Sequence, residues 1–122
     1  MEPSKAVLDG FATVTRLLRA SRPVEYQVTE SRFKVHLPAK PGWSVCRLVD
    51  FDGEHPGVLV PLAAEQVSNL VPLLEAVPLG PRWSRIVLMS RNDLRVIGPA
   101  LCAAWDARSD ASAAGGDEDE PL

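Results

Sequence analysis

Hydrophobic spacing near the N-terminus predicts an amphipathic helix. Four apolar residues recur at intervals of four, three and four: Val7, Phe11, Val14 and Leu18. This spacing places them on one face of a helix over about residues 4–20. Ser4 is suited to cap the start of that helix, and Pro23 prevents its continuation. The chain therefore opens with a helix that buries one apolar stripe.

From residue 24 the apolar positions alternate with polar ones, which is the pattern of a strand with one buried face. Residues 24–28 and 33–37 predict a hairpin closed by a short turn. Residues 43–51 and 58–60 predict a third and a fourth strand, separated by an Asp-Gly turn signal at 52–53. Four consecutive strands are thus expected after the first helix.

A helical period returns over about residues 63–77. Five apolar residues carry it: Val67, Leu70, Val71, Leu74 and Val77. Pro72 lies inside this stretch and removes one backbone donor, so it should kink the helix or split it. The Pro-Leu-Gly-Pro segment at 78–81 marks the end of the element.

The segment over residues 90–98 is open to two interpretations. After a strand at 83–89, Ser90 could cap a helix that runs to Trp105. Alternatively, residues 94–97 form a second strand, and a last helix begins at Pro99, a residue favoured in the first helical position. We favour the second interpretation, because the first places a glycine and a proline inside a helix.

These elements predict an α+β fold with an antiparallel sheet of about five to six strands, flanked by an N-terminal helix, a central Pro-kinked helix and a C-terminal helix. The compact domain is expected over residues 1–105, and a disordered acidic tail over 106–122, which holds six acids and one base. Five residues on the apolar phase of their elements are expected in the core: Phe11, Val35, Val45, Leu70 and Val87.

Composition narrows the class of protein further. The net charge of −3 divides into about −5 on the tail and +2 on residues 1–105. A domain of this length buries a limited share of its surface, which leaves room for a homodimer. No apolar run approaches a membrane span and no signal peptide is visible, so we expect a cytoplasmic protein with no membrane association. Cys46 and Cys102 are expected to be buried, reduced thiols.

The arrangements of residues that usually carry catalysis are largely missing from this sequence. It contains no glycine-rich phosphate loop and no nucleophile elbow. Neither His36 nor His55 has a cysteine at the short spacing that a metal site needs. Both histidines are expected to be solvated. The acids Asp50, Asp52 and Glu54 fit a polar hairpin turn rather than a calcium loop. We therefore expect no enzyme, no metal and no cofactor.

A set of basic and aromatic residues is the most distinctive feature of the body. Its members are Arg32, Lys34, Trp43, Arg47, Arg82, Trp83 and Arg85. Proteins that hold single strands combine a basic groove with aromatic stacking platforms, and sheets often support such surfaces. The leading hypothesis is therefore a module that binds single-stranded DNA or RNA. Against it stand the small body charge and the ordinary use of tryptophan in protein cores.

The end of the chain carries acids, a proline and a terminal apolar residue: Asp117, Glu118, Asp119, Glu120, Pro121 and Leu122. These six residues resemble the C-terminal tip of bacterial single-stranded DNA-binding proteins, although Leu122 stands where that tip usually has an aromatic residue. The resemblance implies that the tail recruits partner proteins or shields the basic site.

The predicted order of helix, strands, helix, hairpin and helix resembles the fold of type III secretion chaperones. Those proteins are dimers that bind an extended segment of a client protein. The resemblance implies a second hypothesis, a small dimeric protein-binding module of the secretion-chaperone kind. Nucleic-acid binding should weaken steeply as salt rises, whereas an apolar client groove should be nearly indifferent to salt.

Overall fold

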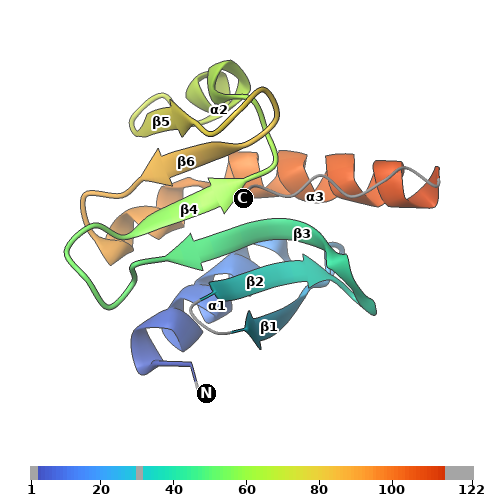
Figure 1. Ribbon diagram of the computed structural model, residues 1–122, viewed down its shortest axis with the longest axis horizontal. Helices are drawn as coiled ribbons and strands as arrows, with labels where there is room; N and C mark the ends of the chain where they lie inside the picture. Colours follow the sequence, from blue (N-terminus) through green and yellow to red (C-terminus); the bar gives the residue numbers. More distant parts are fainter. Residues whose placement is uncertain (1–2, 30–31, 115–122) are drawn as a thin grey trace.

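Six strands form one antiparallel sheet in the order β1-β2-β3-β4-β6-β5 (Figure 1). The computed structural model describes residues 3–29 and 32–114. The strands are β1 (Glu25–Thr29), β2 (Arg32–Leu37), β3 (Lys40–Val49), β4 (Gly57–Val60), β5 (Glu75–Pro78) and β6 (Ser84–Val87). The helices are α1 (Lys5–Leu18), α2 (Ala64–Leu70), the 3₁₀ helix η1 (Arg91–Val96) and α3 (Gly98–Ala113). The predicted α+β class and the N-terminal, central and C-terminal helices are confirmed.

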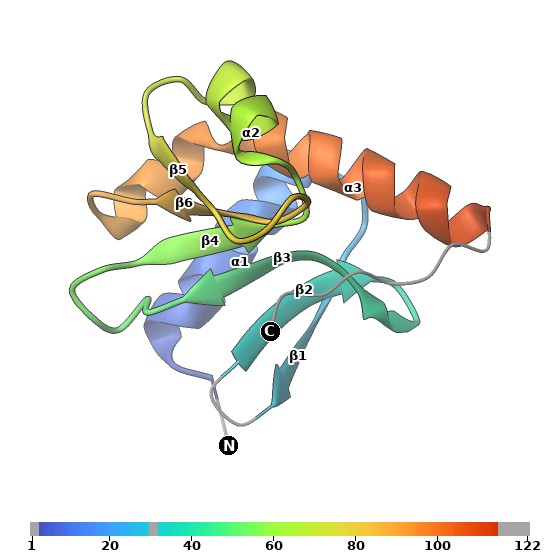
Figure 2. The same cartoon turned by 45° about the horizontal axis from the view of Figure 1, so that its top comes forward.

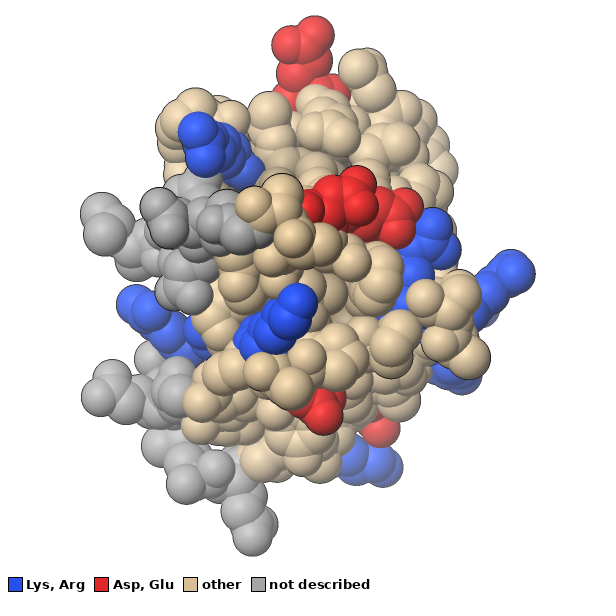
Figure 3. All heavy atoms as spheres, turned by 90° about the vertical axis from the view of Figure 1, so that its right-hand side faces the viewer, with Lys and Arg blue, Asp and Glu red and all other residues tan. Residues whose placement is uncertain are grey.

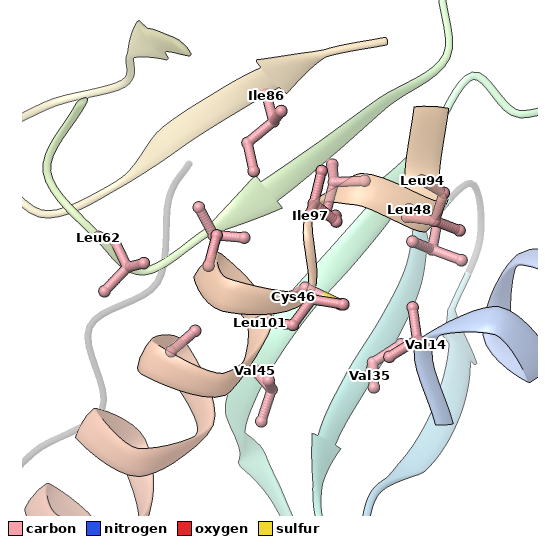
Figure 4. Packing of buried hydrophobic residues seen from close by; sticks show 14 of the residues in the cluster. Val14, Val35, Val45, Cys46, Leu48, Leu62, Ile86, Leu94, Ile97 and Leu101 are labelled. Carbon is pink, nitrogen blue, oxygen red and sulfur yellow. The ribbon is translucent and has the colours of Figure 1, made fainter. Parts of the chain in front are cut away.

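The helices α1 and α3 lie on the same side of the sheet (Figure 2). On that side the strands present side chains with no exposed surface: Val35, Cys46, Val58 and Ile86. From the helices, Val14, Ile97 and Leu101 point into the same cluster (Figure 4). The first helix begins as expected, because the Ser4 hydroxyl accepts a hydrogen bond of 3.3 Å from the Val7 amide. The core thus fills the space between one face of the sheet and two helices.

The central helix is shorter than the apolar pattern predicts. Helix α2 ends at Leu70, before Pro72, and residues 75–78 form the edge strand β5 instead of a second helical half. Strand β5 pairs with β6 from Glu75↔Val87 to Pro78↔Ser84. Proline is tolerated at the end of an edge strand because one row of its backbone groups faces no partner. The expectation of a kinked helix over 63–77 is therefore wrong beyond residue 70.

Neither interpretation of residues 90–98 is correct. The segment forms the 3₁₀ helix η1, and α3 starts at Gly98 with proline in its first turn. Leu94 and Ile97, three residues apart, are both buried in the core, whereas Val96 is 45% exposed. That spacing suits a helical turn, because a strand would send residues three apart to opposite faces. The predicted second strand at 94–97 is absent, but the predicted helix start at Pro99 is confirmed to within one residue.

The last helix extends beyond the predicted end of the domain. Helix α3 runs to Ala113, so the boundary at residues 105 and 106 falls inside a helix. The Trp105 indole nitrogen donates to the Pro23 carbonyl at 3.0 Å, and the Arg22 guanidinium donates to both Asp106 carboxylate oxygens at 3.0 and 3.1 Å. Residues 106–113 thus belong to the folded domain rather than to the tail. The remainder of the predicted tail, 115–122, lies outside the described residues.

Burial corrects several of the predicted core positions. Val35 and Val45 are fully buried, as expected, whereas Phe11, Leu70 and Val87 are only half-buried. The ring of Phe11 packs edge-on against two aromatic rings, with centroid distances of 5.0 Å to Tyr26 and 6.1 Å to Phe33.

Among the described residues, no helix combines the length and the apolar character needed to cross a bilayer.

Substituting Gly10 tests how closely α1 approaches the sheet. A Cβ atom at Gly10 would lie 2.7 Å from the Phe51 ring and 3.1 Å from Leu48. Gly10→Ala should therefore destabilise the protein by roughly 1–3 kcal/mol through overpacking, although alanine is the better helix former. Urea unfolding of the two chains measures the difference.

Gly98→Ala is the matched control for Gly10→Ala. A Cβ atom at Gly98 would meet Leu17 at an ordinary contact distance of 3.5 Å. We expect its free energy of unfolding to stay within about 0.5 kcal/mol of the wild type, the usual range for a substitution that disturbs no contact. Equal stabilities for all three chains would contradict the close packing of α1.

Candidate binding site on the sheet

The face of the sheet opposite α1 and α3 carries one continuous row of side chains across all six strands. The register pairs Gln27 with Lys34, Lys34 with Arg47, Arg47 with Leu59, Leu59 with Arg85 and Arg85 with Val77. Directly opposed residues on neighbouring strands point to the same face. Three of the predicted basic residues, Lys34, Arg47 and Arg85, therefore lie on one face of the sheet.

The other predicted basic residues lie at the borders of this row. Arg32 is two residues before Lys34 in β2, shares its face and is exposed. Arg82 is exposed in the turn before β6. Arg32, Lys34, Arg47 and Arg85 thus share one face of the sheet, whereas Arg82 lies in the turn outside it. The four differ in accessibility: Lys34 and Arg85 are half-buried, whereas Arg47 is only 5% exposed.

Two tryptophans and two arginines form an alternating stack at one end of this face. The Arg108 guanidinium carbon lies 4.8 Å from the ring centroid of Trp43 and 5.8 Å from that of Trp83. The Arg47 guanidinium carbon lies 5.9 Å from the Trp83 centroid. These distances are within the range of cation–π attraction. We call the four residues Trp43, Arg108, Trp83 and Arg47 the Trp–Arg stack.

The Trp–Arg stack limits the access of a ligand to the tryptophan rings. Trp83 is 3% exposed, and the guanidinium groups of Arg47 and Arg108 both lie within 6 Å of its ring. It therefore does not offer the accessible ring on which a base would stack. Trp43 is half-buried. Trp43, Arg47 and Trp83, which the sequence analysis grouped, therefore lie near one another, but the Trp83 ring is enclosed and is not a stacking platform.

Arg108 is the member of the site that sequence analysis missed. It is 6% exposed, and its Nε donates a hydrogen bond of 3.0 Å to the carbonyl of Ser44 in β3. The two residues are 64 positions apart. A signal did exist, because Arg108 is the single base among residues 106–122. The low-complexity composition around Arg108 led to the prediction that residues 106–122 form a disordered tail, so Arg108 was not considered for the site.

The backbone fixes the direction of Arg85 more tightly than that of a surface arginine. Its Nη2 donates to the His55 carbonyl at 2.7 Å. A Cβ atom at Gly57 would lie 2.7 Å from Arg85 Nε, so the missing side chain at Gly57 provides the path along which the guanidinium lies. Arg85 is thereby held across β4 toward the β3–β4 loop.

Two titratable groups of the kind that often serve catalysis, Cys46 and His36, are buried. Burial raises the pKa of the Cys46 thiol to about 12, so the thiol stays protonated at neutral pH. His36 is 5% exposed, and its Nδ1 lies 2.8 Å from the Leu37 carbonyl, which corrects the expectation of a solvated side chain. Within residues 3–29 and 32–114, no group of His, Cys, Asp and Glu is arranged to hold a metal ion.

A second concave region lies between α1 and η1, on the helix side of the molecule. It is a cleft of about 250 Å³ whose polar lining includes Asp9, Thr13, Arg91, Asn92 and Arg95. The arginines there are exposed. The cleft shares no lining residue with the Trp–Arg stack, so the two are separate.

Charges of both signs occur on the side of the molecule where α3 ends. There, lysine and arginine side chains appear at several separate places, with acidic side chains between them (Figure 3). On this side of the molecule, positive charge is therefore divided among separate positions and does not form one broad basic surface. The predicted partner-binding residues, 117–122, lie outside the described residues.

Comparison with protein-family models, curated proteins and solved structures finds no match for this chain.

Removing Arg108 should destabilise the domain. Arg108→Ala removes the side chain between two indoles and the hydrogen bond to a buried carbonyl, so the loss should be at least about 2 kcal/mol. Urea unfolding measures the loss, and near-ultraviolet circular dichroism should change because two tryptophan environments change.

Asp106→Asn is the control on the same helix. It removes only an ion pair with Arg22 whose side chains are 31% and 52% exposed, and such pairs contribute about 0–1 kcal/mol. Arg22 lowers the pKa of the Asp106 carboxyl, so this small contribution is present above the carboxyl's unfolded pKa and is lost as pH falls through the folded value. Equal losses for Arg108→Ala and Asp106→Asn would contradict the role given to Arg108.

The two thiols should differ in reactivity. Cys46 is fully buried with a raised pKa, whereas Cys102 is half-buried. An aromatic disulfide reagent at pH 8 should titrate at most one thiol in the folded protein and both in denaturant. The Cys102→Ser variant should therefore show no fast reaction, and a fast reaction from that variant would contradict the burial of Cys46.

Proposed function

We propose that this protein is a non-enzymatic binding module that holds an extended acidic polypeptide segment across the sheet face opposite α1 and α3. The observation that carries the proposal is the Trp–Arg stack, in which two arginines flank a tryptophan beside the row formed by Lys34 and Arg85. A guanidinium group binds a carboxylate through two parallel hydrogen bonds, so fixed arginines suit acidic side chains.

A polypeptide suits this face better than a nucleic acid because charged and apolar positions alternate on it. Leu59 separates Arg47 from Arg85 in the row, and Val77 ends it. The next row along the strands contains Val49 and Val87, both half-buried. An extended peptide that carries acids and apolar residues complements such a surface, whereas single-stranded nucleic acid gains much of its affinity from accessible aromatic rings.

The order of elements supports the same proposal. A first helix, four strands, a second helix, a β5–β6 hairpin and a last helix follow one another along the chain. The resemblance to type III secretion chaperones, which bind extended client segments, rests on this same order, although the sequence had placed the hairpin at residues 83–89 and 94–97 instead of β5 and β6. The resemblance concerns the fold, and the charged face supplies the argument about the ligand.

Single-stranded nucleic acid is the second candidate. The alignment of Lys34, Arg47 and Arg85 on one face favours it, because phosphates contact basic residues without regard to sequence. Its expected signature is a steep fall in affinity with salt, caused by the release of counterions from the nucleic acid.

The test uses the full chain and two labelled probes, a 12-residue peptide of alternating glutamate and valine and a 15-nucleotide oligothymidine. Lys34→Gln/Arg85→Gln should weaken peptide binding about tenfold, which is the effect of about 1.4 kcal/mol. Fluorescence anisotropy at two salt concentrations measures both affinities, and thermal melting confirms that the variant is folded.

Arg91→Gln/Arg95→Gln, in the helix-side cleft, is the matched control because it removes the same charge from another surface. It should leave peptide binding within about twofold of the wild type, the range expected for distant screened charges. If both double variants weaken binding equally, the sheet face is not the site. If the oligonucleotide binds and the peptide does not, the nucleic-acid candidate replaces the proposal.

A further inference from the structure

We propose that the acidic end of this chain, residues 117–122, docks on the Trp–Arg stack of the same molecule and competes there with an external acidic segment. The docking itself rests on the site and on the sequence of the chain end. The competition rests, in addition, on the proposed function.

The geometry of α3 brings the chain end close to the stack. Arg108 lies in the second half of α3, and the helix ends at Ala113. The rise per helical residue places Ala114 about 9 Å beyond Arg108 along the helix axis. Eight residues follow Ala114, and an extended chain of that length reaches about 26–29 Å. The acidic residues can therefore return to Arg108 and continue past it.

The composition of the chain end suits such a return. Residues 115 and 116 are glycines, which adopt the conformations of a tight reversal at low cost. The four residues that follow are all acidic: Asp117, Glu118, Asp119 and Glu120. Pro121 and Leu122 follow the acids. A reversal at the glycines thus presents consecutive carboxylates to the stack.

The chemistry of the stack matches these carboxylates. The residues Arg47 and Arg108 are only 5% and 6% exposed, so an anion beside them is largely shielded from bulk water. In such surroundings an ion pair is stronger than at an open surface. Arg82, exposed in the turn before Trp83, and Arg85, in the sheet row, extend the positive charge. Half-buried Leu59 offers an apolar contact for the Leu122 side chain in the proposed docking.

Covalent linkage favours this occupant over any free segment of similar sequence. A short tether holds the acids at an effective concentration in the millimolar range, so an affinity that is weak between separate molecules suffices within one chain. A client must displace the tail, and its apparent affinity falls by the fraction of molecules in which the stack is already occupied. The chain end is thereby a competitor built into the protein.

The experiment compares the full chain with a variant in which all four acids of the segment become amides: Asp117→Asn, Glu118→Gln, Asp119→Asn and Glu120→Gln. The readout is the set of three tryptophan indole N–H signals in a two-dimensional ¹⁵N NMR spectrum. At low salt the Trp43 and Trp83 signals should differ between the two chains. The Trp105 signal should not, because its indole donates to the Pro23 carbonyl in a contact between α3 and the segment after α1.

The control variant neutralises four exposed acids elsewhere: Asp9→Asn, Asp52→Asn, Glu54→Gln and Glu65→Gln. It changes the net charge by the same amount and should leave the Trp43 and Trp83 signals of the wild type unchanged. Rising salt should move the wild-type signals toward those of the tail variant, because screening weakens the ion pairs. Identical Trp43 and Trp83 signals in the wild type and the tail variant at low salt would overturn the docking.

Binding of the glutamate–valine peptide separates this inference from the proposed function. If both hold, the tail variant binds the peptide about tenfold more tightly than the wild type at low salt, as expected for a stack that is about nine-tenths occupied. Equal tight binding by both chains overturns the competition and leaves the proposed function standing. Indole signals that depend on the tail, without peptide binding to either chain, support the docking and overturn the proposed function.

Discussion

Arg108 connects the last helix to the end of the sheet, and the position of the candidate site depends on this contact. Strand β3 spans ten residues, whereas its ladder with β4 covers only Arg47 to Val49. The earlier part of β3 therefore has no strand on its β4 side, and the backbone groups there need other partners. The Arg108 guanidinium bonds the Ser44 carbonyl in this region and lies between two indoles.

The course of α3 follows from that contact. Its first half packs over the helix side of the sheet, where Ala100, Leu101 and Ala104 are fully buried. Its second half is held by polar contacts, namely Arg108 with Ser44, Asp106 with Arg22, and Ser112 with Lys40 at 2.8 Å. The helix thus passes from the apolar core to the end of the sheet. There it contributes a positive charge to the face on which Lys34, Arg47 and Arg85 are aligned.

In the function that we propose, the site works by electrostatics that the fold prepares in advance. Arg85 is bonded to the His55 carbonyl, and Arg47 and Arg108 lie over indole rings, so the three guanidiniums lose little further freedom when an anion binds. Arginines fixed in this way bind carboxylates more favourably than mobile surface side chains. The same fixed charges underlie our proposal that the acidic segment competes for this site, since that segment begins a few residues after Arg108.

Part of the site could be predicted from the sequence, and part could not. The sequence analysis grouped Arg32, Lys34, Arg47 and Arg85 in one basic and aromatic set, and the strand ladders align Lys34 with Arg47. The pairing of β4 with β6 then aligned Arg85 with them. Sequence periodicity does not report which strands are neighbours, nor that Trp83 is enclosed between two guanidiniums. It also missed Arg108, because a contact between residues 64 positions apart leaves no local pattern.

The sequence by itself determined the elements whose side-chain periodicity is set by burial on one face. These are α1, strands β1 to β4 and β6, and the start of α3, where Pro99 provides a local signal. Only the tertiary structure decided that residues 75–78 pair as an edge strand, that residues 91–96 form a 3₁₀ turn, and that α3 continues to Ala113. In each of these segments the local preference is weak. Partners distant in the sequence stabilise the conformation: β6 for the edge strand, the core around Leu94 and Ile97 for the turn, and Ser44 and Arg22 for the last turns of α3.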